Sequence, residues 1–203
     1  LTQRQIDEFL NPDYVKDIHD PFLFLDMKKA IYRIYEALLK NEKVLVYGDY
    51  DADGVCATAL MVSVLESIGL QAEVYIPFRE KEGYGLNMSA VKEIIDNKIK
   101  LVITVDCGIA NVNEIKSLGD AGIQTIITDH HNPQSILPDA FAIINPKRIV
   151  EKYPTTEICG TAVAFKVAQA ILSDSIKKEH EGKTLQPAPG FEKWLLESSI
   201  PLI

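Results

Sequence analysis

The sequence has few cysteines, no long apolar run and no signal-peptide pattern, and each of these absences argues against a class of protein. It has three cysteines in 203 residues, Cys56, Cys107 and Cys159, an odd number with no C-x-x-C pair. A disulfide framework or a zinc knuckle is therefore not expected, and a reducing cytoplasm is the expected compartment. No apolar run approaches the ~20 residues that span a bilayer, and no signal-peptide pattern opens the chain, so no membrane association is expected.

The sequence also lacks an excess of basic residues. Lys and Arg number 21 against 29 Asp and Glu, which gives a formal net charge of −8. A protein that binds nucleic acid without sequence preference is usually basic, so the total charge alone argues against that class. Carboxylates that hold metal ions would weaken this argument, because the bound cations offset part of the negative charge. The hydrophobic content of 47% is that of a globular domain with its own core.

No G-x-G-x-x-G motif follows the first predicted strand, which disfavours a Rossmann dinucleotide site. Instead, the apolar run 44–47 leads into Asp49, Asp51 and Asp53, and Gly54 closes the group. Three like charges this close repel one another and lose hydration when they are partly buried. Helix capping accounts for one such aspartate, but three at alternate positions favour a divalent-metal site. Gly54 is expected to let the backbone turn sharply into the next helix.

Apolar strand segments alternate with helical segments from residue 26 onward. The predicted strands are 44–47, 72–76, 101–105, 123–128 and 140–144, and the predicted helices are 27–40, 55–68, 89–97, 111–121, 160–173 and 191–197. This order predicts an α/β fold, a parallel sheet of about five strands flanked by helices on both faces, with a helical C-terminal part.

Flanking segments and helix caps complete this prediction. Residues 1–25 are expected to form an irregular leader whose apolar residues 22–25 pack on the domain, and 174–188 a surface loop or linker. Asp26 is the expected N-cap of the first helix, and Asn87 or Ser89 that of the third. Asn111 and Glu114 fit a capping box at the start of the fourth.

The candidate ligand residues at the ends of the predicted strands are expected to lie together along one edge of the sheet, which we call the rim. Right-handed crossovers place the C-terminal ends of parallel strands on the same edge, where ligands of open α/β sheets bind. Asp106 ends one strand, and Asp129, His130 and His131 end another. Carboxylate and imidazole ligands suit manganese, with magnesium as an alternative. Four or more carboxylates predict two ions about 3.5–4 Å apart, an arrangement suited to phosphoester hydrolysis.

Three motifs in this order resemble the DHH phosphoesterase superfamily: Asp49-Tyr-Asp-Ala-Asp-Gly54, Val105-Asp-Cys-Gly108 and Asp129-His-His131. Further stretches are similar to the single-stranded-DNA-specific exonucleases of that family, and together they cover nearly the whole chain. They are His19-Asp-Pro-Phe22, Asp26-Met-Lys-Lys-Ala30, Glu82-Gly-Tyr-Gly-Leu-Asn87, Asn145-Pro-Lys147, Tyr153-Pro154 and Cys159-Gly-Thr-Ala-Val-Ala-Phe-Lys166.

The resemblance implies a two-metal exonuclease that degrades single-stranded DNA 5′-to-3′ in repair and recombination, using Mn²⁺ or Mg²⁺. The implied metal ligands are Asp49, Asp51, Asp53, Asp106 and His130, with Asp106 between the two ions. His131 is implied to contact the scissile phosphate or a metal-bound water, and Asp129 to orient both histidines. Some family members carry a histidine four positions before Asp51, where this chain has Tyr47. Cys107 is more typical of a small buried hydrophobe than of a ligand.

The resemblance also implies parts outside these residues. A further aspartate ligand, a DHHA1 domain and an OB domain are expected after Ile203, so 26–203 is expected to be a catalytic domain truncated at its C-terminal end. Such a fragment is expected to bind metal weakly and to have little activity. Single-strand-binding protein and a helicase are the implied partners. The basic residues that are candidates for phosphate contacts, or are plain solvated charges, are Arg79, Lys81, Lys147 and Arg148. Tyr84 either stacks on a base or packs in its turn.

Three alternatives remain open. A DHH-family enzyme could act on short oligonucleotides or cyclic dinucleotides, and a non-catalytic replication scaffold could share the fold, although a scaffold would be expected to have lost ligands. The order Asp51-x-Asp53-Gly-Val also matches the haloacid-dehalogenase signature. In that class the first aspartate is a nucleophile, and the Asp129–His131 motif has no role.

Overall fold

The structure is a computed structural model that describes residues 2–11, 13, 17–173 and 190. The predicted linker at 174–188 and the predicted helix at 191–197 lie outside the described residues. The described part contains one five-stranded sheet in the order β2-β1-β3-β4-β5, and every neighbouring pair is parallel. The strands are β1 (Val44–Tyr47), β2 (Ala72–Tyr75), β3 (Leu101–Val105), β4 (Gln124–Thr128) and β5 (Ala142–Ile144). The predicted α/β fold with a parallel sheet is confirmed.

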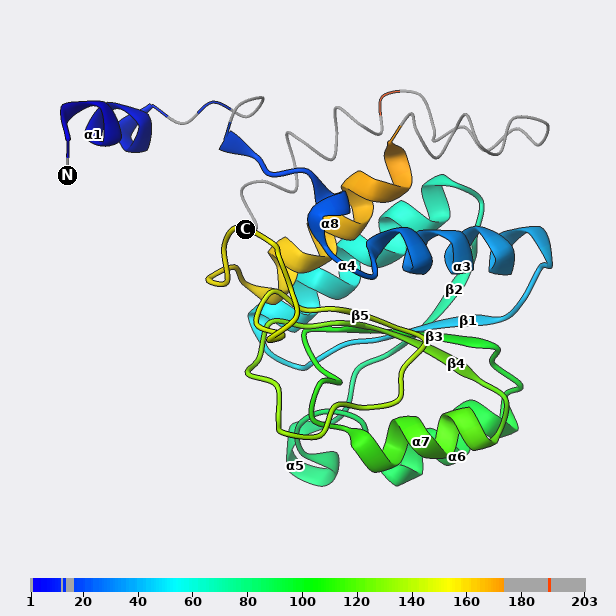
Figure 1. The fold of residues 1–203 in the computed structure, drawn as a ribbon. Helices are drawn as coiled ribbons and strands as arrows, with labels where there is room; N and C mark the ends of the chain where they lie inside the picture. The colour runs from blue at the N-terminus through cyan, green and yellow to red at the C-terminus, as the bar shows by residue number, and fades with distance from the viewer. Residues whose placement is uncertain (1, 12, 14–16, 174–189, 191–203) are drawn as a thin grey trace.

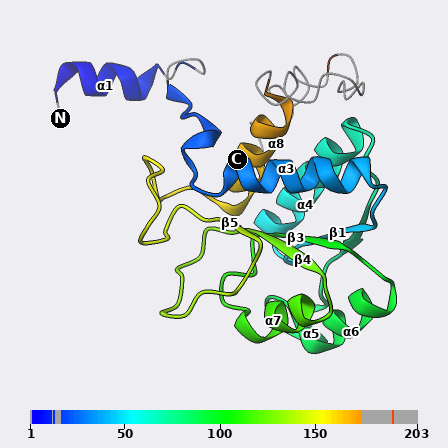
Figure 2. The same cartoon turned by 45° about the vertical axis from the view of Figure 1, so that its right-hand side comes forward.

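Helices cover both faces of the sheet, as Figures 1 and 2 show. On one face lie α3 (Met27–Leu39), α4 (Ala52–Ser67) and α8 (Gly160–Leu172), and on the other lie α5 (Arg79–Glu82), α6 (Met88–Asp96) and α7 (Val112–Asp120). Side chains alternate between the faces of a strand. Val44 and Val46 therefore pack in the core beneath α3, α4 and α8, and Leu45 and Tyr47 pack in the core on the opposite face of the sheet. One continuous apolar strand thus supplies two cores.

Helix α8 is the most buried helix of the described part. It packs against α4 and α3, and twelve of its 13 residues are buried. One of them is Lys166, whose Nζ donates to His19 O and Gln169 Oε1. Burial lowers the pKa of Lys166 to about 8. Although α8 is apolar, no helix in the described ranges is both long and apolar enough to cross a membrane.

The N-terminal segment differs from the expected irregular leader. It contains α1 (Gln3–Leu10), which begins with a capping box between Thr2 and Gln5, and a short 3-10 helix η1 (Pro21–Leu23). Phe24 is buried and stacks on Tyr153 with ring centroids 4.0 Å apart, whereas Leu23 and Leu25 stay exposed. The expected packing therefore holds for part of residues 22–25. Figure 1 shows α1 standing apart from the sheet and its covering helices.

Two predicted caps are in the predicted positions, but their side chains bind distant partners instead of the helix start. Asp26 is the N-cap residue of α3, and its side chain makes no capping hydrogen bond. Its Oδ2 accepts from Ile143 N at 3.1 Å and from Arg148 Nη1 at 2.9 Å, which ties the start of α3 to β5. Asn111 is likewise the N-cap residue of α7, but its side chain does not form the predicted capping box. It binds Leu86 through both its amide atoms, at 3.2 and 2.9 Å, and so holds the loop that precedes α6.

Other boundaries also differ from the prediction. Helix α4 begins at Ala52 rather than at residue 55, with Asp51 as its N-cap, and the short helix α5 was not predicted. Asn87, one of the two predicted caps of α6, fills that role with its Oδ1 accepting from Ala90 N at 2.9 Å. The shift at α4 matters for the site, because it turns the acidic run into a helix start.

Candidate metal centre

Three neighbouring strands deliver acidic residues to one edge of the sheet. Asp49 lies two residues after β1, Asp106 directly follows β3, and Asp129 directly follows β4. These strands are adjacent in the sheet order, so their C-terminal ends form one continuous rim. The rim predicted from strand–helix alternation is therefore present.

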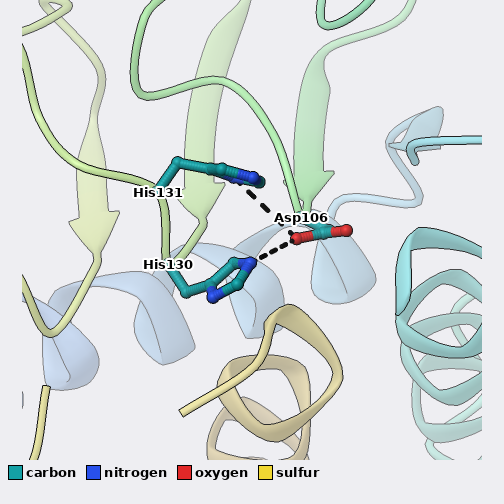
Figure 3. Close-up of side chains that lie close together, drawn as sticks. All are labelled: Asp106, His130 and His131. Atoms are coloured by element: carbon teal, nitrogen blue, oxygen red, sulfur yellow. Dashed lines mark ion pairs between the residues drawn. The ribbon is translucent and has the colours of Figure 1, made fainter. Parts of the chain in front are cut away.

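Two sets of side chains on this rim could hold metal ions. One set is Asp49, Asp51 and Asp106, and the other is Asp106, His130 and His131; within each set the ligand atoms lie within 4.8 Å of one another. Asp106 belongs to both sets. Figure 3 shows both imidazoles facing its carboxylate, with His130 Nε2 at 3.1 Å and His131 Nδ1 at 4.0 Å from Oδ1. Oxygen donors with imidazole suit manganese or magnesium.

Two buried carboxylate oxygens lack a well-formed hydrogen bond among the described residues. Asp49 is 3% exposed and Asp106 is 1% exposed, and neither Oδ1 atom accepts a hydrogen bond of good geometry. The ion pair with His130 Nε2 at 3.1 Å is the contact that Asp106 Oδ1 makes. Burial is the main reason that the pKa of each of these carboxyl groups is raised. A buried carboxylate without a partner is costly. A divalent cation between these oxygens would remove the cost, so the donor set fits a metal centre.

The backbone at the end of β3 aims Asp106 into the site. Asp106 has φ of 59°, in the left-handed region that residues other than glycine rarely adopt. Its N–H donates to Thr128 O at 2.9 Å, and Thr104 Oγ1 donates to Cys107 O at 2.8 Å, which fixes the turn. Strained backbone of this kind gathers at functional sites. Cys107 is fully buried with its thiol toward Tyr47 O, as expected for a small core residue.

Asp129 supports both histidines from below the rim. It is fully buried, and its Oδ1 accepts from His130 N, His131 N and His131 Nδ1 at 2.7, 3.0 and 2.8 Å. Its Oδ2 accepts from Ile109 N at 3.0 Å. Burial alone would raise the pKa of Asp129, but the bonds from His131 and Ile109 lower it overall. The bond between His131 and Asp129 raises the pKa of His131, and the neighbouring Asp106 carboxylate raises the pKa of His130.

Asp51 and Asp53 behave differently although they are two residues apart. Asp51 is exposed, caps α4 through Gly54 N at 2.9 Å, and joins the set around Asp49. Asp53 joins neither set. Its carboxylate accepts from Gly160 N at 2.7 Å, Thr161 N at 2.7 Å and Thr161 Oγ1 at 2.6 Å, while Oδ2 lies 3.7 Å from His130 Nε2. The expected ligand Asp53 is thus bound to the start of α8.

The reason for Gly54 also differs from the prediction. Its φ is not in the left-handed region, so no special turn is needed. A Cβ at Gly54 would lie 2.6 Å from both Cβ and O of Asp49. Glycine is therefore required because the first turn of α4 approaches the backbone of Asp49 closely.

The candidate DNA contacts divide into two groups. Tyr84 is 45% exposed and lies in the site, since its hydroxyl contacts His131 Nδ1 at 2.9 Å and Asp106 O at 3.2 Å. Arg79 is exposed, with its guanidinium 5.3 Å from the ring centre of Tyr50. Lys81 is also exposed.

Lys147 and Arg148 are more enclosed. Lys147 Nζ lies 3.9 Å from Glu157 Oε2. The Arg148 side chain is 10% exposed, pairs with Asp26 and donates to Ile143 O at 2.7 Å. Arg148 is therefore corrected to a structural residue, because its guanidinium is turned into the domain. Sequence reasoning also missed Asn145, whose buried Nδ2 donates to His131 O at 3.0 Å.

Residues 43–188 match the family model described as "DHH family, N-terminal domain". The chain belongs to the DHH family. This membership sets aside the dehalogenase interpretation in which Asp51 would be a nucleophile. The chain is 47% identical over 158 residues to "Single-stranded-DNA-specific exonuclease RecJ" of Bacillus subtilis, covering 78% of this chain and 20% of that protein. It is 36% identical over 146 residues to the protein of the same name in Escherichia coli, covering 71% and 25%.

Solved structures agree with the DHH assignment. The fold is similar to a crystal structure of exonuclease RecJ bound to manganese, with a TM-score of 0.67 and 34% identity over 73% of this chain and 37% of that one. A RecJ structure in complex with Mn²⁺ from Thermus thermophilus matches with a TM-score of 0.61 and 32% identity, covering 73% and 21%. This DHH-family chain spans about a fifth to a quarter of the length of the two curated relatives described above.

Proposed function

We propose that this chain carries the metal centre of a RecJ-type exonuclease, which degrades single-stranded DNA 5′-to-3′ in repair and recombination in the cytoplasm. The observation that carries the proposal is the pair of donor sets that share Asp106. Among the described residues, the buried Asp49 Oδ1 accepts no hydrogen bond, and the buried Asp106 Oδ1 has His130 Nε2 as its ion-pair partner. The similarity to RecJ proteins, two of them solved with manganese, supports the choice of substrate and ion.

The chain's own residues would divide the work at this centre. Asp49, Asp51 and Asp106 would hold one ion, and Asp106 with His130, joined by Asp53, would hold the second. Bound divalent ions would polarise the phosphodiester and lower the pKa of a coordinated water. Asp106 would be the shared ligand, because both donor sets include it.

His131 would handle a proton at the scissile phosphate. Its Nδ1 lies 2.8 Å from Asp129 Oδ1 and 2.9 Å from the Tyr84 hydroxyl, which itself donates to Asp106 O. These partners assign the proton to Nδ1, because the Asp129 oxygen can only accept it. Nε2 is then left to face the substrate.

The strand of DNA would cross the rim beside the exposed side chains of Arg79, Lys81 and Tyr84, with Lys147 as a weaker candidate. Arg148 is not part of this surface. The domain arrangement implied by the family resemblance belongs to the same proposal: 26–203 as the catalytic domain, and a further ligand, DHHA1 and OB domains outside these residues. The coverage of about a fifth of a RecJ relative supports it. Single-strand-binding protein and a helicase are the proposed partners.

The test uses a longer form of the protein that includes the following domains, Mn²⁺, and single-stranded DNA labelled at either end. Asp106→Ala and His130→Ala should lower the rate by more than the about 10–100-fold typical of residues that only support a ligand. Asp120→Ala, on the exposed end of α7, is the matched control and should leave the rate unchanged. Undiminished degradation by both site variants would refute the proposal.

The same assay separates the substrate from the centre. A cyclic dinucleotide is offered in parallel with the DNA, under the same metal concentration. Cleavage of the cyclic dinucleotide alone would keep the metal centre and overturn the choice of substrate. Release of label from the 3′ end first would overturn the proposed direction.

A further inference from the structure

The start of α8 touches the metal centre, and the proposed function assigns it no role. Figure 3 shows the first turn of α8 beside His130 and Asp106. Two of its backbone N–H groups and one hydroxyl bind Asp53, which lies 107 and 108 residues earlier in the chain. This is the segment Cys159-Gly-Thr-Ala-Val-Ala-Phe-Lys166, which the sequence singled out without a function.

Thr161 makes the two oxygens of Asp53 unequal. Oδ1 accepts from both Thr161 N and Thr161 Oγ1, at 2.7 and 2.6 Å, and Thr161 is fully enclosed. Oδ2 accepts from Gly160 N at 2.7 Å, and the Cys159 thiol also hydrogen-bonds the Asp53 carboxylate. Both donors of Thr161 therefore fall on Oδ1, which fixes the rotation of the carboxylate. Oδ2 is also the oxygen that lies 3.7 Å from His130 Nε2.

Gly160 borders the other key carboxylate. A Cβ at Gly160 would lie 2.4 Å from Asp106 Oδ1 and 2.6 Å from its Cγ. That Oδ1 is the buried atom that accepts no hydrogen bond of good geometry among the described residues. Asp106 has little freedom to move away, because it is buried and its backbone is held in the left-handed region. The absence of a side chain at Gly160 therefore keeps the space around Oδ1 open.

We propose that Gly160 and Thr161 are positioning residues of the metal centre. Thr161 holds Asp53 with its Oδ2 toward His130, and Gly160 leaves room for a cation at Asp106 Oδ1. This inference rests on the proposed function and deepens it, since it assigns a second wall to the same centre. The positive end of the α8 dipole also favours the ionised form of Asp53, and bonds from Thr161 and Gly160 lower its pKa despite burial.

A purely structural role for these contacts makes a different prediction. If Asp53 only capped α8, removing the Thr161 hydroxyl would lower stability and leave metal affinity in the folded protein unchanged. If Thr161 positions a ligand, affinity falls even where the protein remains folded. Metal binding, measured directly, therefore separates the two roles without any activity assay.

The experiment measures Mn²⁺ binding by calorimetry in the same longer form of the protein as the activity test, with circular dichroism as the check of folding. Thr161→Val keeps the side-chain shape and removes the hydroxyl; it should weaken Mn²⁺ binding by about 10–100-fold. Thr161→Ser restores the hydroxyl and should bind within about 3-fold of wild type, on the same scale. Thr125→Val is the matched control, because Thr125 is equally buried and its Oγ1 has no partner among the described residues.

Gly160→Ala gives an independent arm, because it leaves the Thr161 hydroxyl in place and adds the clashing Cβ. It should weaken Mn²⁺ binding, whereas Gly119→Ala should not, since a Cβ at Gly119 meets nothing within 4 Å. Wild-type binding by folded Thr161→Val and Gly160→Ala would overturn this inference and leave the proposed function standing. A wild-type longer form that binds no Mn²⁺ would overturn both.

Discussion

Replacing Asp129 with asparagine should destabilise the protein strongly even without metal. Asp129 is fully buried and accepts four hydrogen bonds, three at Oδ1 and one, from Ile109 N, at Oδ2. The asparagine side chain has a single acceptor oxygen and an NH₂ group that can only donate. Whichever way the amide is turned, its NH₂ group faces at least one backbone N–H.

The size of the effect follows from that mismatch. In the better orientation the amide oxygen keeps the contacts to His130 and His131, and Ile109 N–H is left buried without an acceptor. An unsatisfied buried group costs about 1–3 kcal/mol. The remaining bonds also lose their charge assistance, which roughly halves their strength. We therefore expect a loss of about 2–5 kcal/mol, or a fall in Tm of about 5–15 °C for a chain of this size.

The assay is urea unfolding followed by far-ultraviolet circular dichroism, with EDTA present so that no metal contributes. Asp120→Asn is the control for the same chemical change. Asp120 pairs with Lys116 at 2.6 Å but is 69% exposed, so its loss should cost no more than about 0.5 kcal/mol. Equal stability of the two variants would refute the reasoning.

A pH series adds a second check on Asp129. The lowered pKa of Asp129 in the folded state means that its ionised form stabilises the protein above the unfolded pKa of about 3.9. That contribution is lost as the pH falls through the lower, folded value. The stability gap between wild type and Asp129→Asn should therefore narrow in strong acid. It should be widest between the unfolded pKa values of about 3.9 for Asp and about 6.5 for His, because Asp129 also raises the pKa of His131 and that contribution is lost as His131 loses its proton.

Three further substitutions have expected outcomes that follow from contacts in the structure. Asp106→Asn should leave the metal-free protein at least as stable as wild type at pH 7, because it removes a buried charge with a raised pKa, and should abolish the rise in Tm on adding Mn²⁺ in a melting assay. Lys166 has a folded pKa of about 8, below its value of 10.5 unfolded, so wild-type stability in urea should rise between pH 8 and 10 and Lys166→Met should lose this slope. Asp26→Ala should cost about 1–3 kcal/mol in urea, because Arg148 and Ile143 N lose their acceptor.

The strands could be predicted from the sequence because a strand that is buried on both faces needs a continuous run of apolar residues. Val44–Tyr47 and Leu101–Val105 are continuously apolar, and no other element of that length suits such a run. Helix α1 was missed because its mean composition is polar, although Thr2 and Gln5 form a recognisable capping box. The caps were less predictable. A cap signal cannot show that Asp26 binds a residue 117 positions away.

The part of the site that follows from the strand topology could be predicted from the sequence. Parallel strands oblige Asp49, Asp106 and Asp129 to meet, whatever the side-chain details. The supporting contacts were not predictable, because they join residues far apart in sequence. Tyr84 meets His131 across 47 residues, and Asp53 meets Thr161 across 108. The available signal was a glycine followed by a threonine at the start of an apolar helix. Without the fold, this pair does not indicate which residues it contacts.

The acidic residues of the rim divide into two kinds, and the division explains how the charge is tolerated. Asp51, Asp53 and Asp129 each accept backbone N–H groups, from the start of α4, the start of α8 and the rim loops. Asp49 and Asp106 each keep a buried oxygen that accepts no backbone N–H in the described structure, and that of Asp106 is faced by the His130 imidazole.

Aspartates of the first kind are stabilised by backbone N–H groups without any metal. Aspartates of the second kind carry the unfavourable free energy of a buried charge, which one bound ion can remove. This is why neutralising Asp129 and neutralising Asp106 should change metal-free stability in opposite directions. Two buried aspartates at the ends of adjacent strands then differ in role because one has its donors built into the fold and the other depends on a cation.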